Sequence, residues 1–196
     1  MNIEFNEERH EYRVNGVIVP SVTQVLQSVG LPDLSGVPAE LLEWKAGLGT
    51  AVHKATELDD LNDLDEESLD PTIKPYLEAY RKFKRESGFI PTKIEERIYS
   101  KKFGYAGTFD RFGTFLDRYT PVLIDFKTGI TDPLIVGPQT AAYQEAINEP
   151  TRSKGRFWRY ALKLNKDATY RLIRLDNKMD FQIFLNALNL YKWRNQ

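Results

Sequence analysis

Two charged residues interrupt an apolar stretch of the sequence at positions 122–127, which reads Val-Leu-Ile-Asp-Phe-Lys. In a strand, alternate side chains point to opposite faces, so Asp125 and Lys127 would share one face while the even-numbered residues face the core. Charges on a half-buried sheet face are costly unless they are paired or bound to a metal ion. Taken alone, the two residues are explained equally well by an ion pair at the end of a strand.

A second carboxylate precedes this stretch, in the segment Gly107-Thr108-Phe109-Asp110, which we expect on the neighbouring strand. Two carboxylates on adjacent strands, with an ammonium group beside them, form an oxygen-rich site suited to Mg²⁺ or Mn²⁺. The chain has two His and no Cys, which excludes a His-rich metal site, thiolate-held iron–sulfur clusters and cysteine nucleophiles. Any metal ion must therefore be held mainly by carboxylates.

Two further groups of polar residues fall at helical spacing. Gly49, His53 and Glu57 are four residues apart, so they lie near one helix face, where Gly49 would let another backbone come close. Gln139 and Tyr143 have the same spacing. A lone helical His is more often exposed or structurally bonded than a metal ligand, and neither group is informative by itself.

Together these residues form an ordered series: Gly-x3-His-x3-Glu at 49–57, Gly-x2-Asp at 107–110, Asp-x-Lys-Thr at 125–128 and Gln-x3-Tyr at 139–143. In order and spacing the series resembles the RecB-like branch of the PD-(D/E)XK nuclease superfamily. The resemblance extends outward through Pro20-Ser21-Val22-Thr23 and the C-terminal part of the chain, which are similar to features of small phage or prophage exonucleases. Four linked motifs are much more specific than Asp-x-Lys alone.

The resemblance implies metal-dependent hydrolysis of phosphodiester bonds. It assigns metal ligation to the side chains of His53, Asp110 and Asp125 and to the backbone carbonyl of Phe126. Lys127 would be the catalytic lysine, which orients or helps to deprotonate the attacking water and offsets negative charge in the transition state.

The remaining catalytic roles also come from the resemblance. Gln139 and Tyr143 match the motif that positions the lysine and the DNA strand. Members of the family often carry a Glu on the strand before Gly-x2-Asp, and Glu95 and Glu96 compete for that role, with a slight preference for Glu95.

The same resemblance implies one or two Mg²⁺ or Mn²⁺ ions and no iron–sulfur cluster, because such a cluster needs four cysteines. Linear DNA with free ends is the expected substrate, in phage or prophage recombination or DNA processing, with a single-strand annealing protein as a possible partner. Two alternatives stay open: a structure-specific or non-specific endonuclease of the same fold, and a non-catalytic DNA-binding or assembly module.

Turn, cap and periodicity signals predict the elements that position these residues. We predict a hairpin at Asn15-Gly16, a short helix capped by Ser21, helical segments starting near Pro38 and Leu48, and a helix over 75–86. An antiparallel meander is predicted over 94–101, 106–115 and 121–127, then a helix over 136–147, strands over 157–164 and 169–175, and a helix over 180–193.

These elements predict a single α/β domain over 1–196, with a restriction-endonuclease-like core in which helices flank a central mixed sheet. In this division, 1–45 holds the N-terminal β-hairpin and helices, 46–150 the catalytic core, and 151–196 a basic C-terminal hairpin and helix.

Charge is distributed unevenly along the chain. Residues 1–150 carry 16 Lys and Arg against 25 Asp and Glu, whereas residues 151–196 carry 11 against 3. The basic part predicts a sequence-independent grip on a polyanion, with a solvated surface as the alternative. The acidic segment 57–70, with eight carboxylates, is expected to be a solvent-facing helix end and loop.

Two further expectations follow from composition. The aromatic residues of the basic part are expected mostly in the core, with stacking on unpaired bases as the alternative: Trp158, Tyr160, Tyr170 and Trp193. The charged start of the chain and the lack of a long apolar run predict a protein without a secretory signal or membrane association. The resemblance to phage and prophage nucleases implies the cytoplasm of a bacterial host cell.

Overall fold

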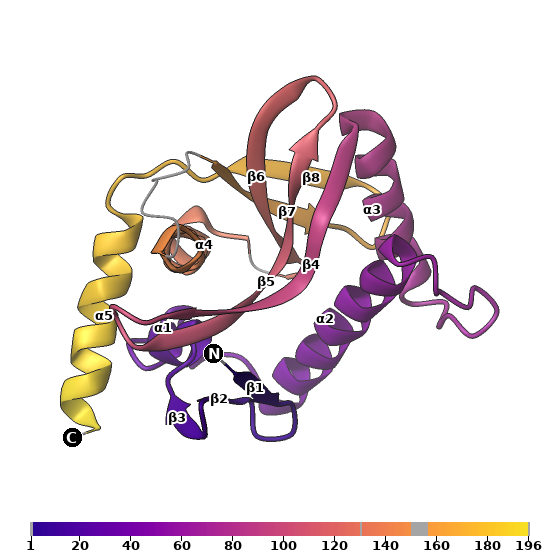
Figure 1. Ribbon diagram of the computed structural model, residues 1–196. Coiled ribbons are helices and arrows are strands. Elements are labelled where there is room, and N and C mark those ends of the chain that lie inside the picture. Colours follow the sequence, from indigo (N-terminus) through magenta and orange to yellow (C-terminus); the bar gives the residue numbers. More distant parts are fainter. Residues whose placement is uncertain (1, 130, 150–156, 196) are drawn as a thin grey trace.

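Three short strands near the N-terminus pair as an antiparallel sheet in the computed structural model, which describes residues 2–129, 131–149 and 157–195 (Figure 1). They are β1 (Ile3–Asn6), β2 (Glu11–Val14) and β3 (Val17–Val19). The predicted hairpin turn joins β2 to β3, and Asn15 and Gly16 have the positive φ angles, 49° and 82°, that such a turn requires. β1 is not among the predicted strands.

The predicted cap begins α1 (Val22–Gln27). Ser21 Oγ accepts a hydrogen bond from the backbone N–H of Gln24, and the Gln24 side chain accepts one from the backbone N–H of Ser21. This reciprocal capping box satisfies two N–H groups that the helix leaves free.

The two helical segments predicted near Pro38 and Leu48 form one continuous helix, α2 (Ala39–Asp60). Gly47 and Gly49 do not end it, because a glycine inside a helix costs only about 1 kcal/mol relative to alanine. The expectation that Gly49 admits another backbone is wrong, since a Cβ there would meet only the side chain of Thr128, at 3.7 Å.

A five-stranded mixed sheet forms the centre of the molecule, in the order β4-β5-β6-β7-β8. Its strands are β4 (Phe89–Ser100), β5 (Tyr105–Phe115), β6 (Arg118–Lys127), β7 (Trp158–Leu164) and β8 (Tyr170–Arg174). The first three form the predicted antiparallel meander, β6 runs parallel to β7, and β7 is antiparallel to β8. The predicted α/β class with a mixed sheet is confirmed.

Helices cover both faces of this sheet (Figure 1). α3 (Lys74–Ser87) and α2 pack on one face, in an apolar cluster that includes Ile124 and Phe126 of β6. α4 (Pro133–Asn148) and α5 (Asp180–Arg194) pack with α1 on the other face, in a cluster that includes Leu123. The alternation predicted for 122–127 is therefore confirmed. Within the described ranges, no helix combines the length and apolar character needed to cross a membrane.

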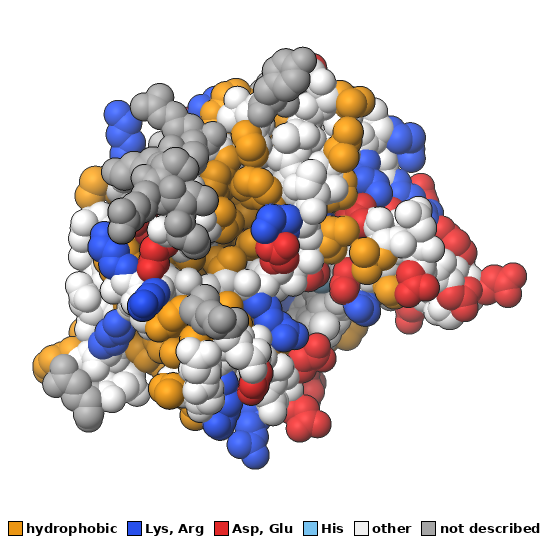
Figure 2. All heavy atoms as spheres, viewed as in Figure 1, with side chains coloured by type: hydrophobic (Ala, Val, Ile, Leu, Met, Phe, Trp, Pro, Cys, Tyr) orange, Lys and Arg blue, Asp and Glu red, His pale blue; other side chains and the backbone are white. Residues whose placement is uncertain are grey.

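Carboxylates gather over the loop between α2 and α3 (Figures 1 and 2), as predicted for the acidic segment. The end of α2 differs from that prediction. Asp60 has only 1% of its side chain exposed, and it pairs with the buried Arg111 and with Lys84, each at 2.7 Å. The segment is thus not only solvent-facing, because Asp59 and Asp60 pair with basic side chains of α3 and β5.

The basic C-terminal part lies only partly at the surface. Arg159 is buried and pairs with Asp180 at 3.0 Å, and Lys192 donates a hydrogen bond to the backbone carbonyl of Phe103. Arg171 and Arg174 of β8 are exposed. Three more basic residues lie outside the described ranges: Arg152, Lys154 and Arg156.

Candidate active site

The two strands that carry Asp110 and Asp125, β5 and β6, stop pairing with each other where these residues lie. The β5–β6 ladder ends with Arg111 opposite Ile124, so each Asp comes directly beyond the last paired residue. Both are buried, with exposures of 7% and 2%. The backbone N–H of Phe126 donates a hydrogen bond to Oδ2 of Asp110. The end of the ladder thus accommodates both predicted carboxylates.

A local break in β-sheet regularity brings in Glu95. Glu95 has a φ of 47°, which is uncommon for a residue with a side chain, and the β4–β5 ladder pairs the residues on either side of Glu95 and Asp110 but not these two. Phe109 belongs to the cluster on the α4–α5 side, whereas Arg111 lies over the Phe126 ring on the α3 side. Side-chain alternation therefore shifts at this point, and Glu95 and Asp110 meet in the site.

His53 reaches the same point from α2. Its Nδ1 atom lies 3.4 Å from Oδ1 of Asp110 and 3.6 Å from Oε1 of Glu95. Ligand atoms of these three residues all lie within 4.8 Å of one another. The neighbouring Val52 and Thr56 are buried, so packing of α2 fixes the approach of His53.

Lys127 lies on the other side of the carboxylates. Its Nζ atom is 2.7 Å from Oδ2 of Asp125 and donates to Oε1 of Gln139 at 3.2 Å. Gln139 in turn donates to the hydroxyl of Tyr143 at 3.0 Å. A Cβ at Gly107 would lie 2.7 Å from the Tyr143 ring, so the glycine of the Gly-x2-Asp motif makes room for that ring.

A fully buried arginine, Arg111, connects the elements that carry the site residues. It donates hydrogen bonds to Glu95 at 2.9 Å, to Asp60 at 2.7 Å and to Thr56 at 3.2 Å. These bonds connect β5 to β4 and to α2, the two elements that supply Glu95 and His53. Neither Arg111 nor Asp60 is among the predicted site residues.

Burial and neighbouring charges shift the ionisation of the site. Burial raises the pKa of Asp125 to about 6 against the opposing effect of Lys127, and burial also raises the pKa of Asp110. Burial alone would lower the pKa of His53, but Asp110 and Glu95 raise it to about 9. The pKa of Lys127 is likewise raised by Asp125 and Asp110, against the effect of burial. His53 and Lys127 are therefore cationic at neutral pH and balance the carboxylates.

The donors at this point fit a small divalent cation. Oδ2 of Asp125 is buried, and among the described residues it is paired with the ammonium group of Lys127, at 2.7 Å. Carboxylate oxygens with one imidazole are ligands that Mn²⁺ accepts, and the carboxylates also suit Mg²⁺. A cation between Asp110 and Asp125 would reduce the repulsion between the two carboxylates, which adds to burial in raising the pKa of Asp125.

The structure brings the side chains of all four sequence motifs to one place and separates the two candidate glutamates. Glu95 lies beside His53, whereas Glu96 pairs with Lys93 at 2.7 Å and has 45% of its side chain exposed. The peptide group of Phe126 lies beside Asp110, and its carbonyl as a metal ligand stays a prediction.

A cleft of about 740 Å³ opens onto these residues. It is also lined by residues of the N-terminal sheet and of β4, among them Phe5, His10, Tyr12 and Arg97. The aromatic residues of the C-terminal part do not line it: Trp158, Tyr160 and Tyr170 pack against the core, and Trp193 is exposed on α5. The aromatic side chains that line the cleft come instead from the N-terminal sheet, as Phe5 and Tyr12, and from α4, as Tyr143.

No family model matches the chain, and no curated protein matches its sequence. The fold is similar to that of a "putative exonuclease" from Eubacterium rectale, with a TM-score of 0.51 and 15% identity over 76% of this chain and 65% of that one. The alkaline exonuclease LHK-Exo from Laribacter hongkongensis, in complex with dAMP, aligns with 15% identity over 90% of this chain and 87% of that one, with a TM-score of 0.40. The chain therefore shares its fold with the Eubacterium rectale protein, and it spans about two thirds of that protein's length.

Proposed function

We propose that this chain is a divalent-metal-dependent deoxyribonuclease that degrades DNA from its ends. It would be a small member of the RecB-like PD-(D/E)XK nucleases that lacks an iron–sulfur cluster. One observation carries the proposal: the ligand atoms of His53, Glu95 and Asp110 lie within 4.8 Å of one another, beside the ion pair of Asp125 and Lys127. This is the donor set and the cationic side chain that phosphodiester hydrolysis needs.

One or two Mg²⁺ or Mn²⁺ ions would be held by His53, Asp110, Asp125 and the Phe126 carbonyl, with Glu95 beside them. When bound, such a cation supplies positive charge against the phosphate oxygens and makes water a better nucleophile. The buried carboxylates suit this task, because a cation bound by them is shielded from bulk water and its field is strong.

Lys127 acts on the substrate. Its ammonium group lies next to the carboxylates, where it orients the attacking water and offsets the negative charge that grows on the phosphate oxygens. Gln139 positions Lys127 through its side-chain oxygen, and Tyr143 fixes Gln139. Attack of water on phosphorus forms a new P–O bond and breaks the bond to the leaving oxygen of the strand.

The experiment that tests this function is digestion of end-labelled linear, nicked and covalently closed circular DNA with Mg²⁺ or Mn²⁺. Progressive loss of linear DNA, with survival of closed circles, is the expected result. Discrete fragments from closed circles would instead support the endonuclease alternative. DNA binding without cleavage of any substrate would support the non-catalytic module.

We also propose the setting that the sequence resemblance suggests. The chain would act as one domain, 1–196, in the cytoplasm of a bacterial host, in phage or prophage recombination or DNA processing, beside a single-strand annealing protein. Co-purification of such a protein with the intact chain from host cells would support this setting.

A further inference from the structure

An aromatic group at the rim of the cleft has no part in the chemistry described above. Phe5 of β1 and Tyr12 of β2 are opposite each other in the N-terminal sheet, with ring centroids 4.5 Å apart. The His10 ring meets the Phe5 ring edge-on at 5.2 Å. All three residues line the same cleft of about 740 Å³ as Asp125 and Lys127.

This group is held in a fixed position relative to the carboxylates. Tyr12 is 4% exposed, and its hydroxyl forms a 2.8 Å hydrogen bond with Thr108, two residues before Asp110 on β5. His10 has a left-handed φ of 48°, and its carbonyl accepts a hydrogen bond from the Gln24 side chain of α1. The contacts tie the N-terminal sheet to the strand and the helix next to the site.

The cationic side chain of Arg97 lies next to this aromatic group. The guanidinium of Arg97 lies 5.9 Å from the centroid of the Phe5 ring, and Arg97 is opposite Thr108 in the β4–β5 ladder. Arg97 is exposed, lines the cleft and forms no ion pair with the described residues. An aromatic ring beside a guanidinium group that lacks a carboxylate partner offers a stacking surface and a phosphate contact at the same place.

We propose that Phe5, His10 and Arg97 form a subsite for one unpaired nucleobase and its phosphate. Such a subsite selects for single-stranded DNA. A base inside an intact duplex is already stacked on both faces and cannot stack on an aromatic side chain as well. The strand that enters the cleft is therefore single-stranded or frayed at its end. This inference rests on the proposed nuclease function, since it places the scissile phosphate at Asp125 and Lys127.

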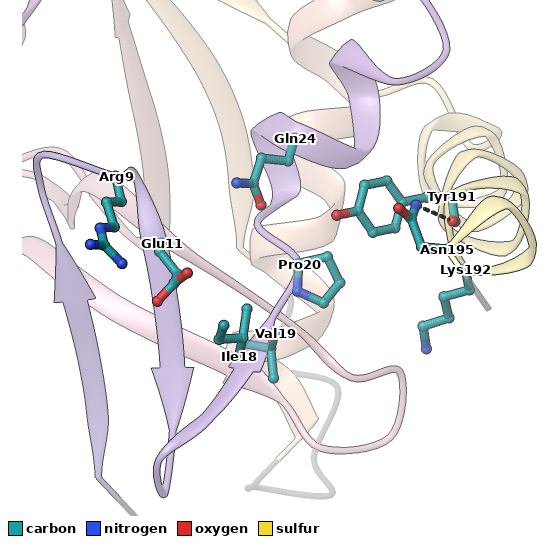
Figure 3. A pocket seen from close by; sticks show the side chains of 9 residues that line it. All are labelled: Arg9, Glu11, Ile18, Val19, Pro20, Gln24, Tyr191, Lys192 and Asn195. Carbon is teal, nitrogen blue, oxygen red and sulfur yellow. Dashed lines mark hydrogen bonds between the residues drawn. The ribbon is translucent and has the colours of Figure 1, made fainter.

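The N-terminal sheet also offers a matched control. Glu11 and Ile18 line a different groove, of about 430 Å³, between β2, β3 and the end of α5 (Figure 3). Ile18 is 56% exposed and is not part of the cleft that contains Phe5. Ile18→Ala thus removes an apolar side chain from the same small sheet without changing the proposed subsite.

The test measures DNA binding in EDTA, where no cleavage occurs, by fluorescence anisotropy with a labelled single strand and a labelled blunt duplex. Phe5→Ala should weaken single-strand binding about tenfold, the usual effect of one lost stacking partner, and should leave duplex binding unchanged. Phe5→Trp should restore single-strand binding, and Ile18→Ala should change neither. One abasic nucleotide in the single strand, at the position that occupies the subsite, should remove the difference between the wild type and Phe5→Ala.

Other outcomes would overturn the subsite: no binding of single strands by the wild type, equal losses with Phe5→Ala and Ile18→Ala, equal losses for single strand and duplex, or no rescue by Phe5→Trp. Thermal unfolding of each variant separates loss of binding from loss of fold. Metal-dependent cleavage by the wild type without any Phe5 effect overturns the subsite alone. Phe5-dependent binding without any cleavage overturns the nuclease function and leaves the single-strand subsite in place.

Discussion

The ammonium group of Lys127 lies 2.7 Å from Oδ2 of Asp125, two residues earlier on the same strand. Because strand side chains alternate, residues two apart share a face, and the two groups can act on one phosphate. Their proposed roles differ: the carboxylate holds the cation, and the ammonium group acts on water and phosphate. Substitutions can therefore separate the two roles.

Lys127→Met should reduce DNA cleavage about a hundredfold or more, because the positioned cationic group is lost. Mn²⁺ binding should be retained or become tighter, because an ammonium group repels a metal cation. Calorimetric titration with Mn²⁺ and a cleavage assay measure the two effects. Lys54→Met is the control, since Lys54 lines the same cleft but has 59% of its side chain exposed and pairs with Glu57. Loss of metal binding in Lys127→Met would contradict the division of roles.

His53→Ala should weaken Mn²⁺ binding about tenfold or more, because an imidazole ligand is removed from a site otherwise made of carboxylates. Cleavage should fall severely as a result. Thermal unfolding in EDTA shows whether the variant keeps its fold. Unchanged activity together with unchanged Mn²⁺ affinity would mean that His53 is a structural residue.

Metal binding should depend on pH in a direction set by the site. The pKa of His53 is raised to about 9, so at pH 7 the cation must displace a proton from His53 before the imidazole can bind it. Apparent affinity should therefore increase between pH 6.5 and 8.5, by about tenfold per pH unit for one displaced proton. Below pH 6 the affinity should fall more steeply, because Asp125, with a pKa of about 6, also becomes protonated.

Calorimetry in two buffers of different ionisation enthalpy counts the released protons directly. We expect proton release on Mn²⁺ binding at pH 7, and less of it in His53→Ala. Binding enthalpies that are the same in both buffers would show that His53 is not a protonated ligand in the metal-free protein.

Arg111→Met should destabilise the fold by about 3 kcal/mol, because it removes one of the two cationic partners of the buried carboxylate of Asp60 and leaves only Lys84. It should also weaken Mn²⁺ binding, since Glu95 loses the hydrogen bond from Arg111. Chemical denaturation measures the first effect. Glu96→Gln, which changes an exposed ion pair on the neighbouring strand, should alter stability by at most about 0.5 kcal/mol. Equal effects of the two substitutions would refute the role of Arg111.

Much of the fold could be predicted because its signals are local. The Asn15-Gly16 turn, the Ser21 cap and the alternation in β6 each depend on a few consecutive residues, and the structure contains all three. The four motifs could likewise be identified from spacing within single elements. The continuity of α2 could not, because Gly47 and Gly49 are weak helix formers, and their cost of about 1 kcal/mol each is small enough for the helix to continue through them.

The residues that surround the predicted motifs could not be predicted, for a different reason. Glu95 enters through a left-handed φ at a non-glycine residue, which strand periodicity does not indicate. Arg111 meets Asp60, which is 51 residues earlier in the chain, and no local pattern connects them. Phe5 and Tyr12 reach the cleft only because the N-terminal sheet packs next to β5, a tertiary contact made through Thr108.

Cleavage of end-labelled linear DNA by the wild type and by Asp125→Asn, with Mg²⁺ and with EDTA, tests the central claim most directly. Asn preserves the size of the side chain but removes the charge that holds the cation. The proposed function predicts cleavage by the wild type with Mg²⁺, and none with EDTA or by a folded Asp125→Asn variant. Undiminished cleavage by Asp125→Asn, or cleavage by the wild type in EDTA, would contradict it.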